Sequence, residues 1–248
     1  MKISYSKMQC YKDCRRMYEL KYIYGVHPTQ QPQTLQDGLS YHEGVEKLIN
    51  KGDDVEIPHT KIGSMLYAFQ KHIELPKCHI KTEQPFCIDV GNHQLVGRFD
   101  GLGDDFVLEH KTTSSNIDGA YWAQAERSEQ VLTYCLASGN TEVLYTACKK
   151  PTIRQKKNET EEEFFDRCCE WYAEKDAKIG QAFLYKTPLQ IERYADILKS
   201  TADEMQNCNL FYKNCGHCMK WGRLCEYAPI CEEYDPKQDY VGFERKEK

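Results

Sequence analysis

The chain has 248 residues, of which 40% are hydrophobic, enough to bury a core in one large domain or two small ones. No apolar run reaches the roughly 18 to 20 residues of a membrane span, and residues 1–6 lack the apolar stretch of a signal peptide, so we expect a soluble, cytoplasmic protein without a membrane partner. The net charge of -5 excludes a surface that is basic throughout, but it allows a local groove that binds DNA.

Hydrophobic spacing predicts two helices near the N-terminus. Residues 4–24 begin with serines suited to capping a helix and continue with an apolar stripe. A break rich in Pro and Gln begins at Val26, and a second helical pattern covers residues 35–49 before the turn-forming residues 51–54.

The middle of the chain changes to short β-type runs separated by turn residues, which indicate successive strands of a meander. These runs are 85–90, 94–100 and 106–111. Residues 121–137 return to helical spacing, and residues 143–148 are typical of a further strand. The charged segment 149–163 is predicted to be a loop. Two more helices are expected near 161–177 and 189–205.

An acid ends one predicted strand, and an acid-x-Lys pattern ends the next. Residues two apart in a strand share a face, so Glu109 and Lys111 should point the same way, and an antiparallel neighbour would bring Asp100 beside them. Carboxylates that hold Mg²⁺ or Mn²⁺, next to an ammonium that orients water or stabilises charge, suit phosphodiester hydrolysis. Burial of residues 106–108 favours this interpretation over a solvated hairpin, because ionised residues at the end of a buried strand need partners. The side chain of His110 should face away from the metal.

Further stretches, in the same order along the chain, match motifs of one nuclease family. Residues 97–101 match a Gly-x-x-Asp-Gly motif, residues 109–111 a Glu-x-Lys motif and residues 130–134 a Gln-x-x-x-Tyr motif. Gly38 and His42 match an upstream helix that supplies a metal-binding histidine. In these stretches the chain resembles the PD-(D/E)XK nucleases of the RecB type, in particular CRISPR-associated and phage-encoded exonucleases.

This resemblance extends over residues 4–231 and implies a fold, an activity and residue roles. The implied fold is α/β, with a mixed central sheet flanked by helices and a C-terminal iron–sulfur segment. The implied activity is Mg²⁺- or Mn²⁺-dependent exonuclease cleavage of DNA. The implied catalytic residues are Asp100, Glu109, Lys111, Gln130 and Tyr134. The implied metal ligands are His42, Asp100, Glu109 and the backbone carbonyl of His110.

Thirteen cysteines, an odd number, argue against a complete disulfide framework and favour metal binding. Four of them lie within 17 residues and could hold a zinc ion by themselves; these are Cys215, Cys218, Cys225 and Cys231. The resemblance implies a different set, in which Trp221-Gly222-Arg223 lies between the first two C-terminal ligands and a four-iron four-sulfur cluster is bound. Its implied ligands are Cys14, Cys218, Cys225 and Cys231.

The spacing of the cysteines leaves two choices open. Cys10 could replace Cys14 one helical turn away, and Cys215 could replace Cys218. Cysteines in apolar strands or helices are instead expected to be buried free thiols. They are Cys87, Cys135 and Cys148.

Residues 149–157 carry five positive charges in an acidic protein, which predicts a loop that contacts DNA phosphates. Its candidate residues are Lys149, Lys150, Arg154, Lys156 and Lys157. Residues 150–154 are also similar to a Lys-Pro-x-x-Arg segment of phage members of the family. Tyr121 and Trp122 could stack on bases or belong to the core.

We expect one nuclease domain over residues 1–235, with its cluster segment at 208–231, followed by a charged tail at 236–248. The expected partner is DNA, with a helicase or recombination protein as a further partner, in recombination or repair within a bacterial or phage-infected cell. The alternative is a zinc- or iron–sulfur-containing DNA-binding or assembly protein with an inactive nuclease fold.

Overall fold

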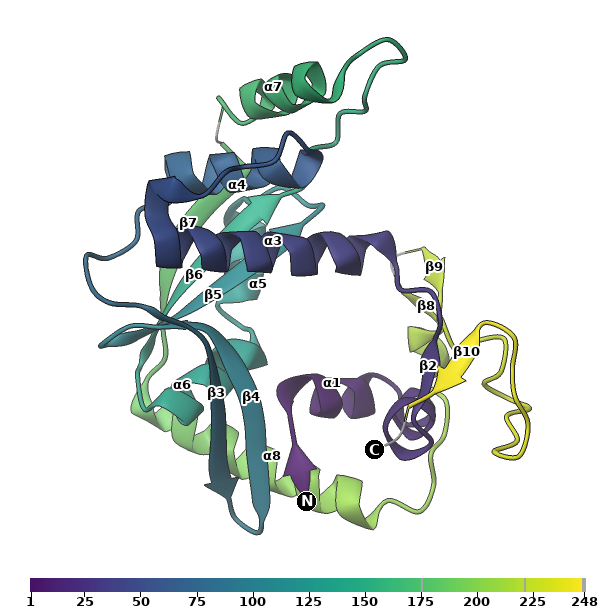
Figure 1. Ribbon diagram of the computed structural model, residues 1–248. Coiled ribbons are helices and arrows are strands. Elements are labelled where there is room, and N and C mark those ends of the chain that lie inside the picture. Colours follow the sequence, from purple (N-terminus) through teal and green to yellow (C-terminus); the bar gives the residue numbers. More distant parts are fainter. Residues whose placement is uncertain (175, 221, 247–248) are drawn as a thin grey trace. The chain divides into compact units, whose positions relative to one another are not determined.

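The computed structural model describes residues 1–174, 176–220 and 222–246 (Figure 1). The chain divides into two compact units. The terminal unit consists of Met1–Pro32, Cys87–Gly97 and Ala195–Lys248, and the sheet unit consists of Gln33–Phe86 and Arg98–Tyr194. The single domain predicted over residues 1–235 stays a prediction.

A mixed β-sheet forms the centre of the sheet unit. Its strands are β3 (Lys81–Val90), β4 (His93–Leu102), β5 (Phe106–Thr113), β6 (Glu142–Lys149) and β7 (Ile179–Tyr185). The order is β4-β5-β6-β7, with β3 paired to β4; β5 and β6 are parallel, whereas β4–β5 and β6–β7 are antiparallel. The apolar start of β5, residues 106–108, is buried, as a central strand with a parallel neighbour requires. The predicted α/β class with a mixed central sheet is confirmed.

Helices cover both faces of this sheet (Figure 1). They are α3 (Gln33–Lys51), α4 (Lys61–His72), α5 (Gly119–Ala125) and α6 (Glu129–Ser138), and α7 (Glu161–Trp171) packs on α4. One core joins α3 and α4 to Cys148 and Ile179 of the sheet, and a second core joins α5 and α6 to Val107 and Val143. The alternation of side chains along each strand produces these two cores.

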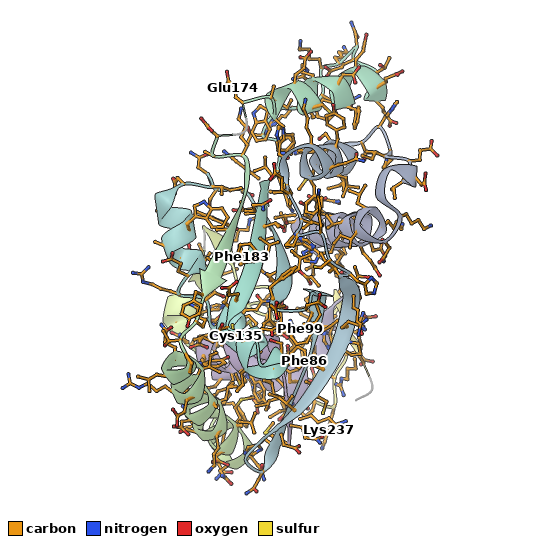
Figure 2. The ribbon with its side chains drawn as sticks, turned by 90° about the vertical axis from the view of Figure 1, so that its left-hand side faces the viewer. Phe86, Phe99, Cys135, Glu174, Phe183 and Lys237 are labelled. Atoms are coloured by element: carbon orange, nitrogen blue, oxygen red, sulfur yellow. The ribbon has the colours of Figure 1, made fainter. Side chains whose placement is uncertain are left out.

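The rings of Phe86 and Phe99 pack at 4.5 Å between centroids, in the same core as Cys135 (Figure 2). This contact joins β3 to β4 beneath α6. It fixes the strand that carries Asp100, because Phe99 is buried immediately before that acid.

The terminal unit consists of short elements. They include β1 (Lys2–Ile3), α1 (Tyr5–Asp13), α2 (Arg15–Tyr18), a π-helical turn (Glu19–Ile23), β2 (Val26–Pro28), β8 (Met219–Lys220), β9 (Arg223–Leu224) and β10 (Phe243–Arg245). The C-terminal part of α8 (Pro188–Asn207) also belongs to this unit. A small core of Leu20, Val26, Tyr227 and Ile230 joins the first helical segments to the cysteine-rich segment.

Several predicted boundaries are wrong for identifiable reasons. The helix predicted over 4–24 is interrupted at Cys14, whose backbone is extended with φ -160° and ψ 113°. The helix predicted over 121–137 is two helices, because Ser128 caps a new one by accepting a hydrogen bond from the Gln130 N–H. Helix α7 ends at Trp171, before the predicted end at residue 177. Helix α4 and strand β7 were not expected at all.

No helix in the described part of the chain is both long and apolar enough to cross a membrane.

Candidate active site and cysteine pocket

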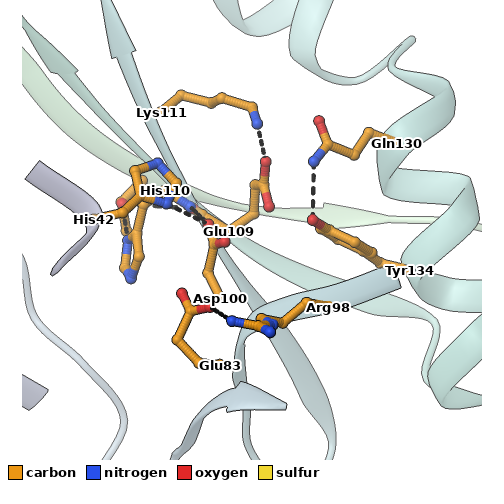
Figure 3. Close-up of polar contacts among 10 residues, drawn as sticks. His42, Glu83, Arg98, Asp100, Glu109, His110, Lys111, Gln130 and Tyr134 are labelled. Carbon is orange, nitrogen blue, oxygen red and sulfur yellow. Dashed lines mark hydrogen bonds and ion pairs between the residues drawn. The ribbon is translucent and has the colours of Figure 1, made fainter. Parts of the chain in front are cut away.

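Asp100, Glu109 and Lys111 come together where β4 and β5 pair (Figure 3). Gly101 pairs with Leu108, which places Asp100 opposite Glu109 on the antiparallel neighbour. The Asp100 Oδ2 accepts a hydrogen bond of 2.8 Å from the backbone N–H of His110, and the Lys111 ammonium forms an ion pair with the Glu109 carboxylate. The structure therefore confirms the prediction that Glu109 and Lys111 share a face of the strand and that Asp100 lies beside them.

The carboxylate of Glu109 is the most deeply buried charged group of this site. The residue is 1% exposed, and, its ion pair with Lys111 aside, neither oxygen has a hydrogen bond of ordinary geometry within the described residues. Burial raises the pKa of Glu109 to about 7, since the Lys111 ammonium offsets only part of the cost of removing the charge from water. A carboxylate held in this way has unused capacity to bind a cation.

His42 on α3 lies beside Asp100, with 3.4 Å between Nδ1 and Oδ2. Burial alone would raise the pKa of Asp100, but the hydrogen bond and charge of His42, helped by the His110 N–H, outweigh it and lower the pKa to about 2. Burial alone would lower the pKa of His42, but the hydrogen bond to Asp100 and its charge outweigh it and raise the pKa. His42 must lose its proton before it can act as a metal ligand.

The side chain of His110 lies on the other face of β5 from Glu109. Its Nδ1 is 2.7 Å from the Thr146 Oγ1, and its ring contacts Phe69 edge-on at 5.4 Å. Burial lowers the pKa of His110 to about 4, which keeps the ring neutral. Thr146 was not selected from the sequence, although a polar residue inside an apolar strand was a signal of this role.

Gln130 and Tyr134 lie one turn apart on α6, on the side of Glu109 (Figure 3). The Gln130 side-chain amide donates a hydrogen bond of 2.9 Å to the Tyr134 hydroxyl. Burial, reinforced by the charges of Glu109 and Asp100, raises the pKa of Tyr134, so its hydroxyl stays protonated next to both carboxylates. The pair supplies neutral polar groups at the rim of the acidic site.

An ion pair that was not expected from the sequence lies beside Asp100. Arg98 on β4 and Glu83 on β3 are 3.2 Å apart (Figure 3). Glu83 adopts a left-handed backbone with φ 50°, which is unusual for a residue with a side chain. The signal that could have found Arg98 is its place within the Gly-x-x-Asp-Gly motif.

The donor chemistry of the site fits a divalent cation, because one imidazole and two carboxylates are suitable ligands for Mg²⁺ or Mn²⁺. The arrangement is not a preformed metal site: among described residues, no group of three or more His, Cys, Asp or Glu side chains is placed to hold an ion. Each acid instead contacts a nitrogen group of the chain, Asp100 the imidazole of His42 and Glu109 the ammonium of Lys111. A bound cation would compensate the negative charge of the two carboxylates in place of these contacts.

The basic segment divides into anchored and exposed residues. Lys149 donates to the Asn116 side chain at 2.6 Å, and Lys150 donates to the Thr34 carbonyl at 2.8 Å and pairs with Asp37 at 3.3 Å. The side chains that are exposed are those of Arg154, Lys156 and Lys157. The predicted phosphate contacts are therefore open to solvent at these three residues, whereas Lys149 and Lys150 are held by other parts of the chain.

In the terminal unit, four cysteines line one cavity of about 190 Å³. They are Cys14, Cys218, Cys225 and Cys231. Cys10 and Cys215, the two alternatives that spacing left open, do not line it. The same four residues that the family resemblance selected therefore share a pocket.

Local backbone structure directs these thiols into the pocket. The extended conformation of Cys14 interrupts the helix, and the Asn214 N–H donates to its sulfur at 3.3 Å. The Cys225 N–H donates to the Cys218 carbonyl at 2.8 Å, which closes the hairpin of β8 and β9 between them. Burial, together with the neighbouring thiols, raises the pKa of Cys225 and Cys231. A bound cation would reverse this shift. Trp221 of this hairpin lies outside the described residues.

The remaining cysteines bear on two predictions. Cys135 and Cys148 are fully buried, as expected. The prediction that Cys87 is buried is wrong, because its position in β3 points to the exposed side of the strand. All 13 cysteines are free thiols in the structure.

No protein-family model matches the chain, and no curated protein matches its sequence. Two solved structures resemble it in part. A protein of Eubacterium rectale, to which exonuclease activity is assigned provisionally, has 10% identity and a TM-score of 0.48 over 86% of this chain and 84% of its own. The protein SSO0001 has 15% identity and a TM-score of 0.45 over 84% and 79%. Both scores are too low to support an argument about fold or activity.

The buried state of Glu109 predicts how stability depends on pH. Its carboxyl pKa is about 7 in the folded protein against an ordinary value of 4.5, so the folded state keeps this proton over a pH range in which the unfolded state has lost it. The contribution of Glu109 to the free energy of unfolding therefore falls as the pH rises through this range, by about 3 kcal/mol in total.

In metal-free protein, Glu109→Gln should remove this contribution. The free energy of unfolding can be measured in urea at pH 5 and pH 8. We expect the difference between variant and wild type to shift in favour of the variant by up to about 3 kcal/mol from pH 5 to pH 8. A difference between variant and wild type that does not change with pH would contradict the assignment.

Proposed function

We propose that this protein is a metal-dependent nuclease that shortens DNA from its ends. The observation that carries the proposal is the buried, under-bonded carboxylate of Glu109, placed between Lys111 and Asp100 at the paired ends of β4 and β5. A charged group kept in such a place lowers stability, and chains retain groups of this kind where chemistry needs them.

His42, Asp100, Glu109 and the backbone carbonyl of His110 would hold Mg²⁺ or Mn²⁺. When bound, the cation polarises the phosphodiester and activates a water. Lys111 would then exchange its partner, from the Glu109 carboxylate to the attacking water or the phosphate oxygen. Gln130 and the protonated Tyr134 would hold the scissile phosphate or the bound water through neutral hydrogen bonds.

DNA would reach this site past the exposed cations of the basic segment. Arg154, Lys156 and Lys157 would contact backbone phosphates, which contribute affinity without sequence preference. Lys149 and Lys150 would act indirectly, by anchoring the segment to Asn116 and Asp37. A nuclease of this kind would act in phage or bacterial recombination or repair, together with a helicase or recombination protein.

We further propose that Cys14, Cys218, Cys225 and Cys231 bind a four-iron four-sulfur cluster. Their shared cavity supports this assignment, and four thiolates are its usual ligands. A single zinc ion bound by the same four thiolates is the alternative. The cluster would have a structural role, because hydrolysis transfers no electrons.

The nuclease proposal predicts metal-dependent shortening of end-labelled linear DNA. Asp100→Ala and Lys111→Ala should each lower the rate by about a hundredfold or more, because each removes a group that acts on the reacting phosphate. Asp105→Asn, at an exposed acid in the turn between β4 and β5, is the matched control and should cleave like the wild type.

The protein for this assay should be purified without oxygen, to retain any cluster, and tested with Mn²⁺, Mg²⁺ and EDTA. Absence of cleavage by the folded wild type would reject the enzyme and favour a binding or assembly protein. Full activity in Lys111→Ala would reject the assigned role of that residue.

The cluster proposal predicts which cysteines matter for iron. Cys14→Ala and Cys225→Ala should lose bound iron, acid-labile sulfide and visible absorption. Cys10→Ala and Cys215→Ala, in which the altered thiol lies outside the cavity, should retain all three. Zinc in place of iron in the anaerobic protein, or loss of iron in Cys215→Ala, would contradict the assignment.

A further inference from the structure

The terminal unit contains a second cavity, of about 300 Å³, beside the cysteine pocket. Its lining includes Tyr11, Lys12, Arg15, Glu204, Tyr212 and Asn214. These residues come from α1, α2, α8 and the segment that precedes the cysteine hairpin. The volume is at the lower end of the range in which proteins bind small molecules or single nucleotides.

Aromatic rings and a guanidinium form an ordered stack in this cavity. Arg15 lies between two rings, 5.0 Å from the centroid of Tyr11 and 4.9 Å from that of Tyr212. Arg15 also forms an ion pair with Glu204, to which the Tyr11 hydroxyl donates at 3.2 Å. These contacts fix the orientation of Arg15, and Arg15 in turn supports one face of the Tyr212 ring.

The ring of Tyr212 ends this stack at the surface, where the residue is 53% exposed. An exposed aromatic ring with a fixed orientation is a platform for a nucleobase, and such stacking requires a base that is not paired. Supporting the ring from beneath reduces the conformational entropy that binding would cost.

The charges around the cavity suit the phosphate that accompanies such a base. The two acids have partners: Glu204 pairs with Arg15, and Asp13 lies 3.4 Å from the Lys220 ammonium. Lys12 adds a further positive charge at the exposed rim. Because both acids are paired with cations, the lining does not repel the phosphate of a bound nucleotide.

We infer that this cavity binds one unpaired nucleotide of a single-stranded DNA segment, with the base on Tyr212. The inference rests on the proposed function, since it gives that nuclease a preference for single-stranded ends. It adds a DNA contact in the terminal unit that is separate from the catalytic residues.

The test is binding of a fluorescent oligothymidylate of about ten nucleotides, measured by anisotropy with EDTA present so that no strand is cut. Tyr212→Leu should weaken binding about tenfold, because it removes the ring but keeps apolar bulk. Tyr212→Phe should bind like the wild type, since the ring is enough for stacking. Tyr185→Leu changes a tyrosine of similar exposure (58%) on β7 and is the matched control.

Three results would each overturn the inference. One is wild-type affinity in Tyr212→Leu. Another is equal weakening in Tyr212→Leu and Tyr185→Leu. The third is competition by a blunt duplex, or by free thymidine monophosphate, as effective as competition by the unlabelled single strand.

The outcome can be separated from that of the nuclease proposal. Binding is measured with EDTA present, so it is determined independently of cleavage. A protein that binds through Tyr212 but cuts nothing would retain this inference and lose the enzyme. If the wild type cuts DNA and Tyr212→Leu binds the oligonucleotide as tightly as the wild type, the enzyme is retained and this inference is lost.

Discussion

The burial of one carboxylate, that of Glu109, constrains every element around the candidate site. Strand β5 is buried because it lies between β4 and a parallel partner, β6, with helices over both faces of the sheet. An acid at that position cannot be solvated, so it needs a positive group that the same strand can supply two residues later, and Lys111 meets this need. The antiparallel neighbour contributes Asp100, which the His110 N–H holds in place. The ion pair and the strand pairing together give the site its shape.

The same physical principle applies to the cysteine pocket of the terminal unit. Both places gather groups that become anions, and in both burial opposes ionisation: the pKa of Glu109 is raised, and so are those of Cys225 and Cys231. Such groupings cost stability until a cation compensates the charge. The two cations that we propose differ in chemistry: a hard divalent ion bound by oxygen and nitrogen, and iron bound by sulfur.

Residue spacing was enough to predict the sheet position of the acids, because a strand period of two and an antiparallel turn leave few arrangements for Asp100, Glu109 and Lys111. It could not predict the contacts of His42 or Thr146, which depend on how α3 and β6 pack on β5. Helix α4 was missed although its apolar face is regular, and strand β7 was missed because its exposed Phe183 and Tyr185 obscure the alternation. That Cys14, and not Cys10, lines the cysteine pocket depends on the interruption of the helix at Cys14, which periodicity had predicted to be continuous.

The most direct test of the central claim is to titrate Mn²⁺ into the metal-free protein at pH 8 and measure binding by calorimetry. The account predicts saturable binding that Asp100→Asn weakens strongly, because that substitution removes a carboxylate ligand. Absence of binding, or equal binding by Asp100→Asn, would show that these side chains form an ordinary buried ion-pair network and not a metal centre.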